Sequence, residues 1–130
     1  KRPGSYPPGY FYAHFCYFNL DLDKMREAAA YLVGEHDFKS FCSAGAQVQT
    51  TVRTIYAVNV TKEDDMVHIR ITGNGFLYNM VRIIAGTLMQ VGTGLMEPEQ
   101  VKEILEARDR SKAGPTAVAK GLTLVEIRYE

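Results

Sequence analysis

Cysteine and histidine are scarce in this chain of 130 residues, and their scarcity excludes two common ways of stabilising a small protein. The two cysteines, Cys16 and Cys42, are too few and too far apart for a disulfide scaffold or a cysteine-rich zinc site. The three histidines show none of the spacings typical of metal ligands. We therefore expect reduced thiols in a cytoplasmic protein, and no metal site.

Net charge and long apolar runs are also missing. Fifteen basic and fifteen acidic side chains cancel, which argues against a polybasic nucleic-acid binder but leaves room for a local basic strip. The longest apolar stretch, residues 76–91, is interrupted by polar residues and is shorter than the roughly 20 apolar residues that span a bilayer, so no membrane partner is expected. The chain is 46% hydrophobic, which predicts one folded domain over residues 1–130.

Apolar residues follow the two-residue period of β-strands in several segments. Residues 52–61 and 66–72 alternate apolar and polar residues, as in an antiparallel hairpin with one buried face. Residues 10–18 are dense in aromatic side chains on both faces, which suits a strand covered on at least one side. A last strand is expected at residues 122–129.

Three helices and a short helical turn are predicted between these strands. Each helix begins near a capping or initiating residue, and the short turn is anchored by two phenylalanines. The predictions are a helix through Met25 and Val33 capped by Asp21 or Asp23 and stopped by Gly34, a turn at residues 38–41, a helix over residues 76–91 capped by Asn74 and ended by Gly92 or Gly94, and a helix with Pro98 at its first position.

This order of elements predicts an α+β fold. It matches a ferredoxin-like split β-α-β arrangement, in which helices cover one face of an antiparallel sheet. The other face of the sheet would then lie free for RNA, a partner domain or a second subunit.

One arginine is isolated in the apolar helix. Between Met66 and Met96 there is no Asp or Glu, and the only Lys or Arg residues are Arg70 and Arg82. A buried guanidinium needs a carboxylate, and breaking such a pair costs roughly 3–5 kcal/mol. Either Arg82 pairs with an acid of its own chain, or it receives a carboxylate from another domain or subunit; the residues alone leave both open.

Two further segments allow alternative interpretations. Residues 108–121 carry four cations and one anion in a small, turn-forming loop, which would hold phosphates or would simply complement a helix C-terminus in solvent. The loop matches no nucleotide-binding motif. The aromatic residues of segment 10–18 would stack RNA bases or, more simply, pack in the core.

Several spaced motifs resemble the tRNA pseudouridine synthase A family. They are Phe76-Leu77-Tyr78-Asn79-Met80-Val81-Arg82-Ile83-Ile84-Ala85-Gly86-Thr87-Leu88, then Val91-Gly92, Arg108-Asp109-Arg110, Ala113-Gly114-Pro115-Thr116-Ala117 and Gly121-Leu122, with support from Gly34-Glu35-His36-Asp37-Phe38 and Arg53-Thr54-Ile55. The resemblance covers residues 22–129, whereas residues 1–20 match the family poorly. The chain departs from the family pattern at Val118, where proline is frequent, and at Thr123, where tyrosine is frequent.

The resemblance implies half of the pseudouridine synthase fold and an activity that needs two domains. The family isomerises uridine to pseudouridine in the tRNA anticodon stem-loop, at positions 38 to 40, with no cofactor and no metal, and uses an aspartate in a Gly-Arg-Thr-Asp motif. No aspartate of this chain follows Arg-Thr. The chain is therefore expected to be a C-terminal domain, inactive without an N-terminal domain that carries the catalytic aspartate, and to form a homodimer in the complete enzyme.

The resemblance also assigns roles to individual residues. Arg82 would pair with the catalytic aspartate, whereas Leu122, Tyr78 and Asn79 would bind the substrate. Phosphates of the RNA would lie near a set of basic residues: Arg108, Arg110, Lys112 and Lys120. Two alternatives stay open at this point, a non-catalytic RNA-binding module and a ferredoxin-like regulatory domain.

Overall fold

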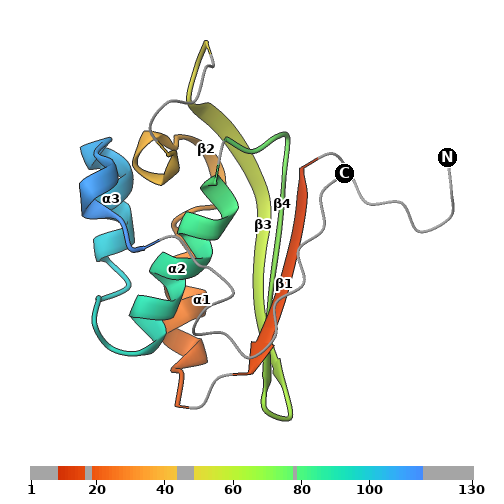
Figure 1. Ribbon diagram of the computed structural model, residues 1–130. Helices are drawn as coiled ribbons and strands as arrows, with labels where there is room; N and C mark the ends of the chain where they lie inside the picture. Colours follow the sequence, from red (N-terminus) through yellow and green to blue (C-terminus); the bar gives the residue numbers. More distant parts are fainter. Residues whose placement is uncertain (1–8, 17–18, 44–48, 78, 116–130) are drawn as a thin grey trace, which may run out of the picture.

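A four-stranded antiparallel sheet forms the base of the protein (Figure 1). The computed structural model describes residues 9–16, 19–43, 49–77 and 79–115. Within them, the strand order is β1-β4-β3-β2, and each neighbouring pair is antiparallel. The strands are β1 (Tyr10–Cys16), β2 (Gly34–Asp37), β3 (Val52–Glu63) and β4 (Met66–Gly73).

The sheet has the split β-α-β connection that the order of elements predicts. Both β1 and β3 run antiparallel to β4, which lies between them, so β1 and β3 are parallel to each other. The chain crosses from β1 to the β2–β3 part of the sheet through α1 (Leu22–Ala30). The predicted α+β, ferredoxin-like class is therefore confirmed for the part of the chain that the structure describes.

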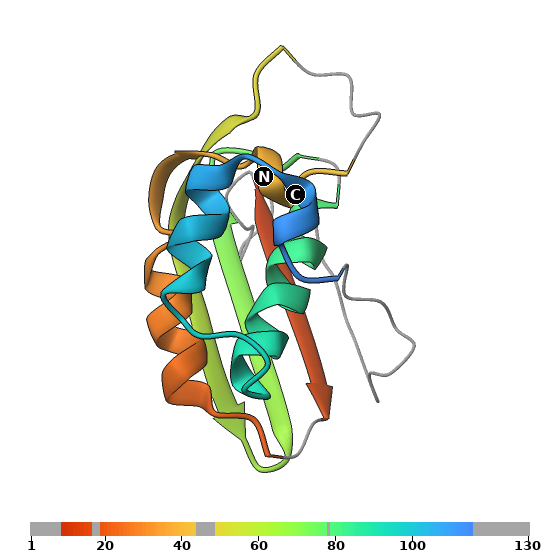
Figure 2. The ribbon, with the colours of Figure 1, turned by 90° about the vertical axis from the view of Figure 1, so that its left-hand side faces the viewer.

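All helices among the described residues lie on one side of the sheet (Figures 1 and 2). In addition to α1, the chain forms α2 (Met80–Gly92), α3 (Gln100–Ala107) and two short 3₁₀ helices, η1 (Lys39–Phe41) and η2 (Arg110–Lys112). Helices α1 and α2 lie directly against the strands, whereas α3 and η1 form an outer layer in Figure 1. The carboxylate of Asp21 caps α1 by accepting a hydrogen bond from the Lys24 amide at 3.0 Å, as predicted.

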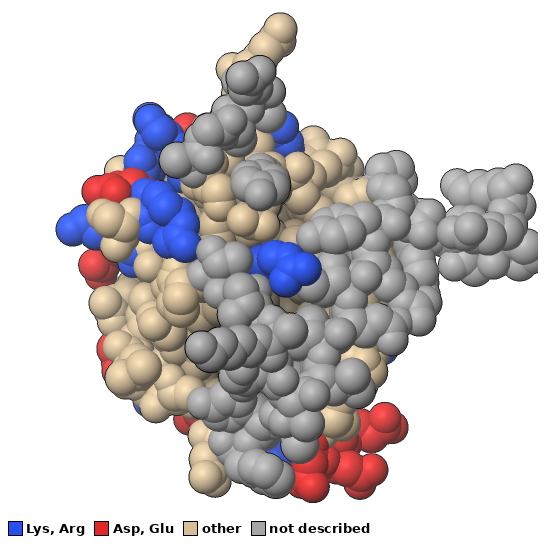
Figure 3. Space-filling view, in the orientation of Figure 1, with Lys and Arg blue, Asp and Glu red and all other residues tan. Residues whose placement is uncertain are grey.

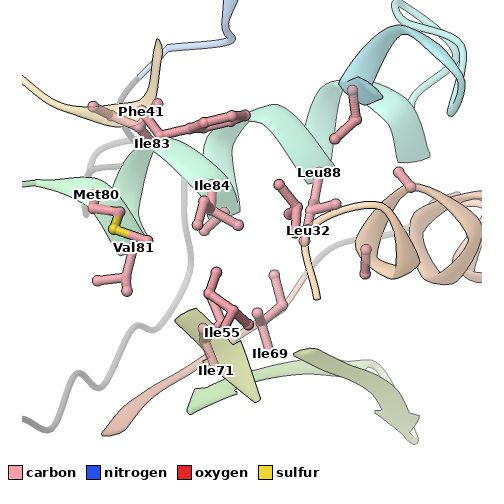
Figure 4. Close-up of a cluster of buried hydrophobic side chains, with 14 of the residues drawn as sticks. Leu32, Phe41, Ile55, Ile69, Ile71, Met80, Val81, Ile83, Ile84 and Leu88 are labelled. Atoms are coloured by element: carbon pink, nitrogen blue, oxygen red, sulfur yellow. The ribbon is translucent and has the colours of Figure 1, made fainter. Parts of the chain in front are cut away.

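The core lies on two opposite sides of α2 (Figure 4). Toward the sheet, Ile84 and Leu88 point at the apolar side chains of β3 and β4, including Ile55 and Ile69. On the far side of the helix, Ile83 lies against Phe41 of η1. A helix buried on both sides must be apolar around most of its circumference, which explains the composition of this segment.

The sequence was misleading at the start of α2. Asn74 does not cap the helix, because its side-chain oxygen accepts a hydrogen bond from the Thr54 amide at 2.9 Å and so closes the end of the β3–β4 ladder. The helix begins only at Met80, after Asn79, whose backbone is left-handed with φ of 58°. It ends at Gly92, as predicted.

Two other helix boundaries differ from the predictions, and one strand was not predicted. Helix α1 ends at Ala30, before Gly34, which instead adopts a φ of 111° at the start of the unpredicted strand β2. Helix α3 begins at Gln100 rather than at Pro98. The strand predicted at residues 122–129 and the end of the one predicted at 10–18 lie outside the described residues.

Two carboxylates meet where α1 approaches the start of α3. A side-chain hydrogen bond with Glu99 raises the pKa of Glu27, and partial desolvation and the negative charge of Glu99 add to this effect. A raised pKa in the folded state means that the pair is favourable when one group is protonated and that this stability is lost as the pH rises through the folded pKa.

We therefore expect Glu27→Gln to raise the melting temperature at pH 7, because the substitution removes the repulsion but keeps a hydrogen-bonding side chain. The gain should shrink as the pH is lowered toward 4, where the wild-type pair takes up a proton. Thermal unfolding followed by circular dichroism at both pH values measures the effect. Glu35→Gln on β2 is the charge-matched control, and equal gains from the two variants would contradict the assignment.

Candidate functional site

The start of α2 carries two of the residues singled out by the resemblance. Arg82 is half-buried in the first turn of the helix, on a different side from the core residues Val81 and Ile84. Asn79 precedes the helix, and its side-chain amide donates a hydrogen bond to the Ser43 hydroxyl at 3.2 Å. This bond ties the start of α2 to the segment that follows η1.

Arg82 has an interaction partner within this chain, so it is not a residue left without a partner. Its importance for function therefore depends on where it lies and on the family to which the chain belongs. Tyr78, Lys120 and Leu122, the other residues assigned by resemblance, lie outside the described residues.

The basic segment after α3 is folded by its own side chains. Arg108 ends α3 in a left-handed conformation with φ of 53°. Asp109 then caps η2 by accepting hydrogen bonds from the amide and hydroxyl of Ser111, at 3.0 and 2.8 Å, and these bonds lower the pKa of Asp109. Arg110 donates to the Gly114 carbonyl at 3.0 Å, and Lys112 is exposed.

Ser40 connects this basic segment to the outer layer of the fold. Its hydroxyl is fully buried, donates to the Ile104 carbonyl at 2.6 Å and accepts from the Asp109 amide at 2.7 Å. The Ser40 hydroxyl thereby gives a hydrogen-bond partner to a backbone carbonyl near the end of α3 and to the backbone amide just before η2. Ser40 was not predicted from the sequence; the available signal was its position between two phenylalanines, Phe38 and Phe41, that anchor the turn.

A second buried hydroxyl attaches the same segment to α2. Thr87 donates to the Ile83 carbonyl at 2.8 Å and accepts from the Gly114 amide at 2.9 Å. The backbones approach so closely that a Cβ on Gly114 would lie 2.8 Å from the Thr87 Cα, which only glycine avoids. Thr87 was also missed. Residues 108–115 are therefore held against α2 from one end and against η1 from the other.

Positive charge gathers where these elements meet. Figure 3 shows Lys and Arg side chains over the end of α3 and η1, with acidic side chains beside them, and a group of acidic side chains without cations near the β3–β4 turn. The Arg108 guanidinium lies 3.7 Å from the Asp37 carboxylate, but its side chain remains 67% exposed, so the pair is weak and leaves the cation accessible. An accessible cation that lies near other cations, on a backbone that hydrogen bonds hold in place, is suited to binding phosphates.

Within the ranges that the structure describes, no group of three or more His, Cys, Asp or Glu side chains is arranged to hold a metal ion. The helices of those ranges are all too short or too polar to cross a membrane.

Comparison with known proteins identifies the family. Residues 28–130 match the model of a tRNA pseudouridine synthase family. The chain belongs to this family. It is 58% identical to tRNA pseudouridine synthase A of Brevibacillus brevis over 118 residues, which are 91% of this chain and 48% of that protein. It is 52% identical to tRNA pseudouridine synthase A of Bacillus subtilis over 130 residues, which are 100% of this chain and 52% of that protein.

The structure shows where the motifs that resemble the family lie in the fold. The longest of the motifs that resemble the family contains the start of α2, and the basic motif at residues 108–110 lies at the junction of α3 and η2. The chain spans about half the length of these curated relatives.

The buried hydroxyl of Ser40 gives a test of how the basic segment is held. We expect Ser40→Ala to lower the free energy of unfolding by about 1–3 kcal/mol, because the Ile104 carbonyl loses a buried hydrogen bond and the Asp109 amide loses its partner. Urea unfolding measures the change. Ser111→Ala, at an exposed position, should change stability by at most about 0.5 kcal/mol; equal effects at the two positions would refute the role of Ser40.

Proposed function

We propose that this chain is the C-terminal domain of a tRNA pseudouridine synthase that isomerises uridine to pseudouridine in the anticodon stem-loop of tRNA. The observation that carries the proposal is the position of Arg82, half-buried in the first turn of α2, within the longest of the motifs that resemble the family, and on the helix to which Thr87 attaches the basic segment. The family match over residues 28–130 supports it.

The reaction rearranges one nucleoside. The bond between uracil N1 and ribose C1′ breaks, a bond from C5 to C1′ forms, the C5 proton leaves, and N1 gains a proton. Reactant and product have the same composition, so the balance requires neither a redox cofactor nor a metal. What the protein must supply is a nucleophilic or basic group held in position beside the sugar.

In the proposed enzyme that group is an aspartate of a second, N-terminal domain, and Arg82 positions it. A guanidinium at contact distance lowers the pKa of a carboxyl group and keeps it ionised. The planar fork of arginine binds both carboxylate oxygens, which fixes the direction of the side chain as well as its charge. Arg82 is half-buried rather than enclosed in the core, which agrees with this role.

The other assigned residues complete the proposed site. Tyr78, Asn79 and Leu122 contact the target nucleotide, with Leu122 as an apolar floor, and the RNA phosphates lie near Arg108, Arg110, Lys112 and Lys120. The complete enzyme is a cytoplasmic homodimer whose partners are tRNA and the domain with the catalytic aspartate. For Arg108, the support is an exposed side chain on a backbone fixed by Ser40.

A chimera tests the proposal. In tRNA pseudouridine synthase A of Brevibacillus brevis, this chain replaces the residues that it matches, and pseudouridine formation is measured on an unmodified tRNA transcript. We expect the chimera to be active and Arg82→Ala to lower kcat by about 100-fold or more, because a positioned charge at the reacting centre is lost.

Two controls make the result specific. Arg82→Lys keeps the charge without the fork and should be intermediate, whereas Lys24→Ala removes a cation from α1 and should leave kcat within about twofold, as is usual for remote surface substitutions. A folded chimera with no activity, or an Arg82→Ala variant with full turnover, would reject the proposed function. Activity of this chain without a second domain would reject the assigned division of the site.

A further inference from the structure

The sheet has a second face that the helices do not cover, and its side chains form a pattern of their own. Along β4, Val67, Ile69 and Ile71 are buried toward the helices, so the residues between them point to the opposite face. The register places His14 opposite His68, and Asn59 opposite Arg70. In Figures 1 and 2 the described helices all lie on the other side.

Four of these side chains form one cluster, which we name the sheet-face cluster: Tyr12, His14, His68 and Arg70. The Arg70 guanidinium carbon lies 5.0 Å from the centre of the Tyr12 ring, a cation–π contact. The Tyr12 hydroxyl and His68 Nδ1 share a hydrogen bond of 2.7 Å. The ring of Tyr12 lies 5.4 Å from that of His14 and 5.9 Å from that of His68, measured between centroids. Arg70 is exposed, and the three rings are half-buried.

The two strands that carry the cluster, β1 and β4, contain no carboxylate. Strand β3 contains one carboxylate, Glu63, at its last position. That residue and the neighbouring acids Asp64 and Asp65 are exposed at the β3–β4 turn, which is one end of the sheet. A negatively charged ligand is therefore attracted to Arg70 and repelled from the turn.

A second copy of the chain is a poor occupant for this face. In a two-fold interface the same patch meets itself, so Arg70 and the histidines would face their own copies, with no carboxylate in β1 or β4 to pair with them. A polyanion does not meet this difficulty. Aromatic rings and an arginine plane, interleaved with Asn59 and Thr61, are also the groups that stack on bases and bind phosphates.

We propose that the sheet-face cluster is an RNA-binding surface, separate from the site at Arg82, that holds a single-stranded or looped part of the tRNA. Arg70 contacts phosphate or stacks on a base, and His68 contributes a ring edge. Tyr12 is a positioning residue, because it holds Arg70 by the cation–π contact and His68 by the hydrogen bond. This inference rests on the proposed function for the identity of the RNA.

The test measures binding separately from turnover. In the chimera described above, fluorescence anisotropy with a labelled tRNA transcript gives the affinity at several salt concentrations. We expect Arg70→Gln to weaken binding about tenfold. It should also reduce the slope of log affinity against log salt concentration by about 0.7–0.9, which is the change expected when one phosphate contact is lost. The kcat at saturating RNA should stay unchanged.

Matched variants separate this role from general charge and from packing. Lys102→Gln removes one positive charge from α3, on the helical side, and should weaken binding less than about twofold. Tyr12→Leu removes the ring and should weaken binding about fivefold, while Tyr12→Phe keeps the ring and should stay within about twofold. Circular dichroism confirms that each variant is folded.

Three outcomes would overturn the proposal. Arg70→Gln and Lys102→Gln have equal affinities and salt slopes, or the unsubstituted chimera binds no tRNA, or Arg70→Gln changes the oligomeric state in analytical ultracentrifugation, which would make this face a subunit interface. The activity of the chimera tests the proposed function separately. If the chimera is active but Arg70→Gln leaves its tRNA affinity unchanged, only the inference about the sheet-face cluster is refuted.

Discussion

The burial of α2 on two opposite sides is the constraint on which the rest of the structure depends. One side of the helix covers the sheet, and the other is covered by η1 and Phe41 (Figure 4). Burial on both sides removes almost all water from the helix, so each polar group there needs a partner inside the protein. Thr87 illustrates the consequence, because its buried hydroxyl bonds both its own helix and the Gly114 amide. The same burial that stabilises the helix thus determines where the basic segment runs.

The parts of the fold that follow from periodic apolar burial could be predicted from the sequence. The hairpin of β3 and β4 was recognisable because its alternation continues over many residues, and α1 because its cap and apolar spacing agree. Asn74 failed as a cap because an asparagine before a helix has two competing partners, and here the Thr54 amide of the neighbouring strand is the one it binds. Strand β2 was missed because four residues are too few to show a period.

The candidate site was predictable to a different degree. Arg82 is conspicuous in the sequence because a charge in an apolar helix is rare. The basic run at residues 108–112 is visible because three of its five residues are Arg or Lys. Ser40 and Thr87, which hold these parts together, carry no such signal, since a hydroxyl residue is equally common on a surface. The sheet-face cluster depends on strand register, which brings Tyr12 beside Arg70 although they are far apart in sequence.

The two proposed surfaces differ in the physics that governs them. A residue that orients a reacting carboxylate acts through a single contact. At a partly buried position, salt screens the attraction between the two charges only weakly, and the geometry of the contact determines the reaction rate. An exposed arginine on an open sheet acts through phosphate neutralisation, which salt weakens and which leaves the chemical step unchanged. Arg82 is half-buried and Arg70 is exposed, so the structure already separates them by environment. A domain with no net charge can therefore bind a polyanion, because the location of its cations matters more than their sum.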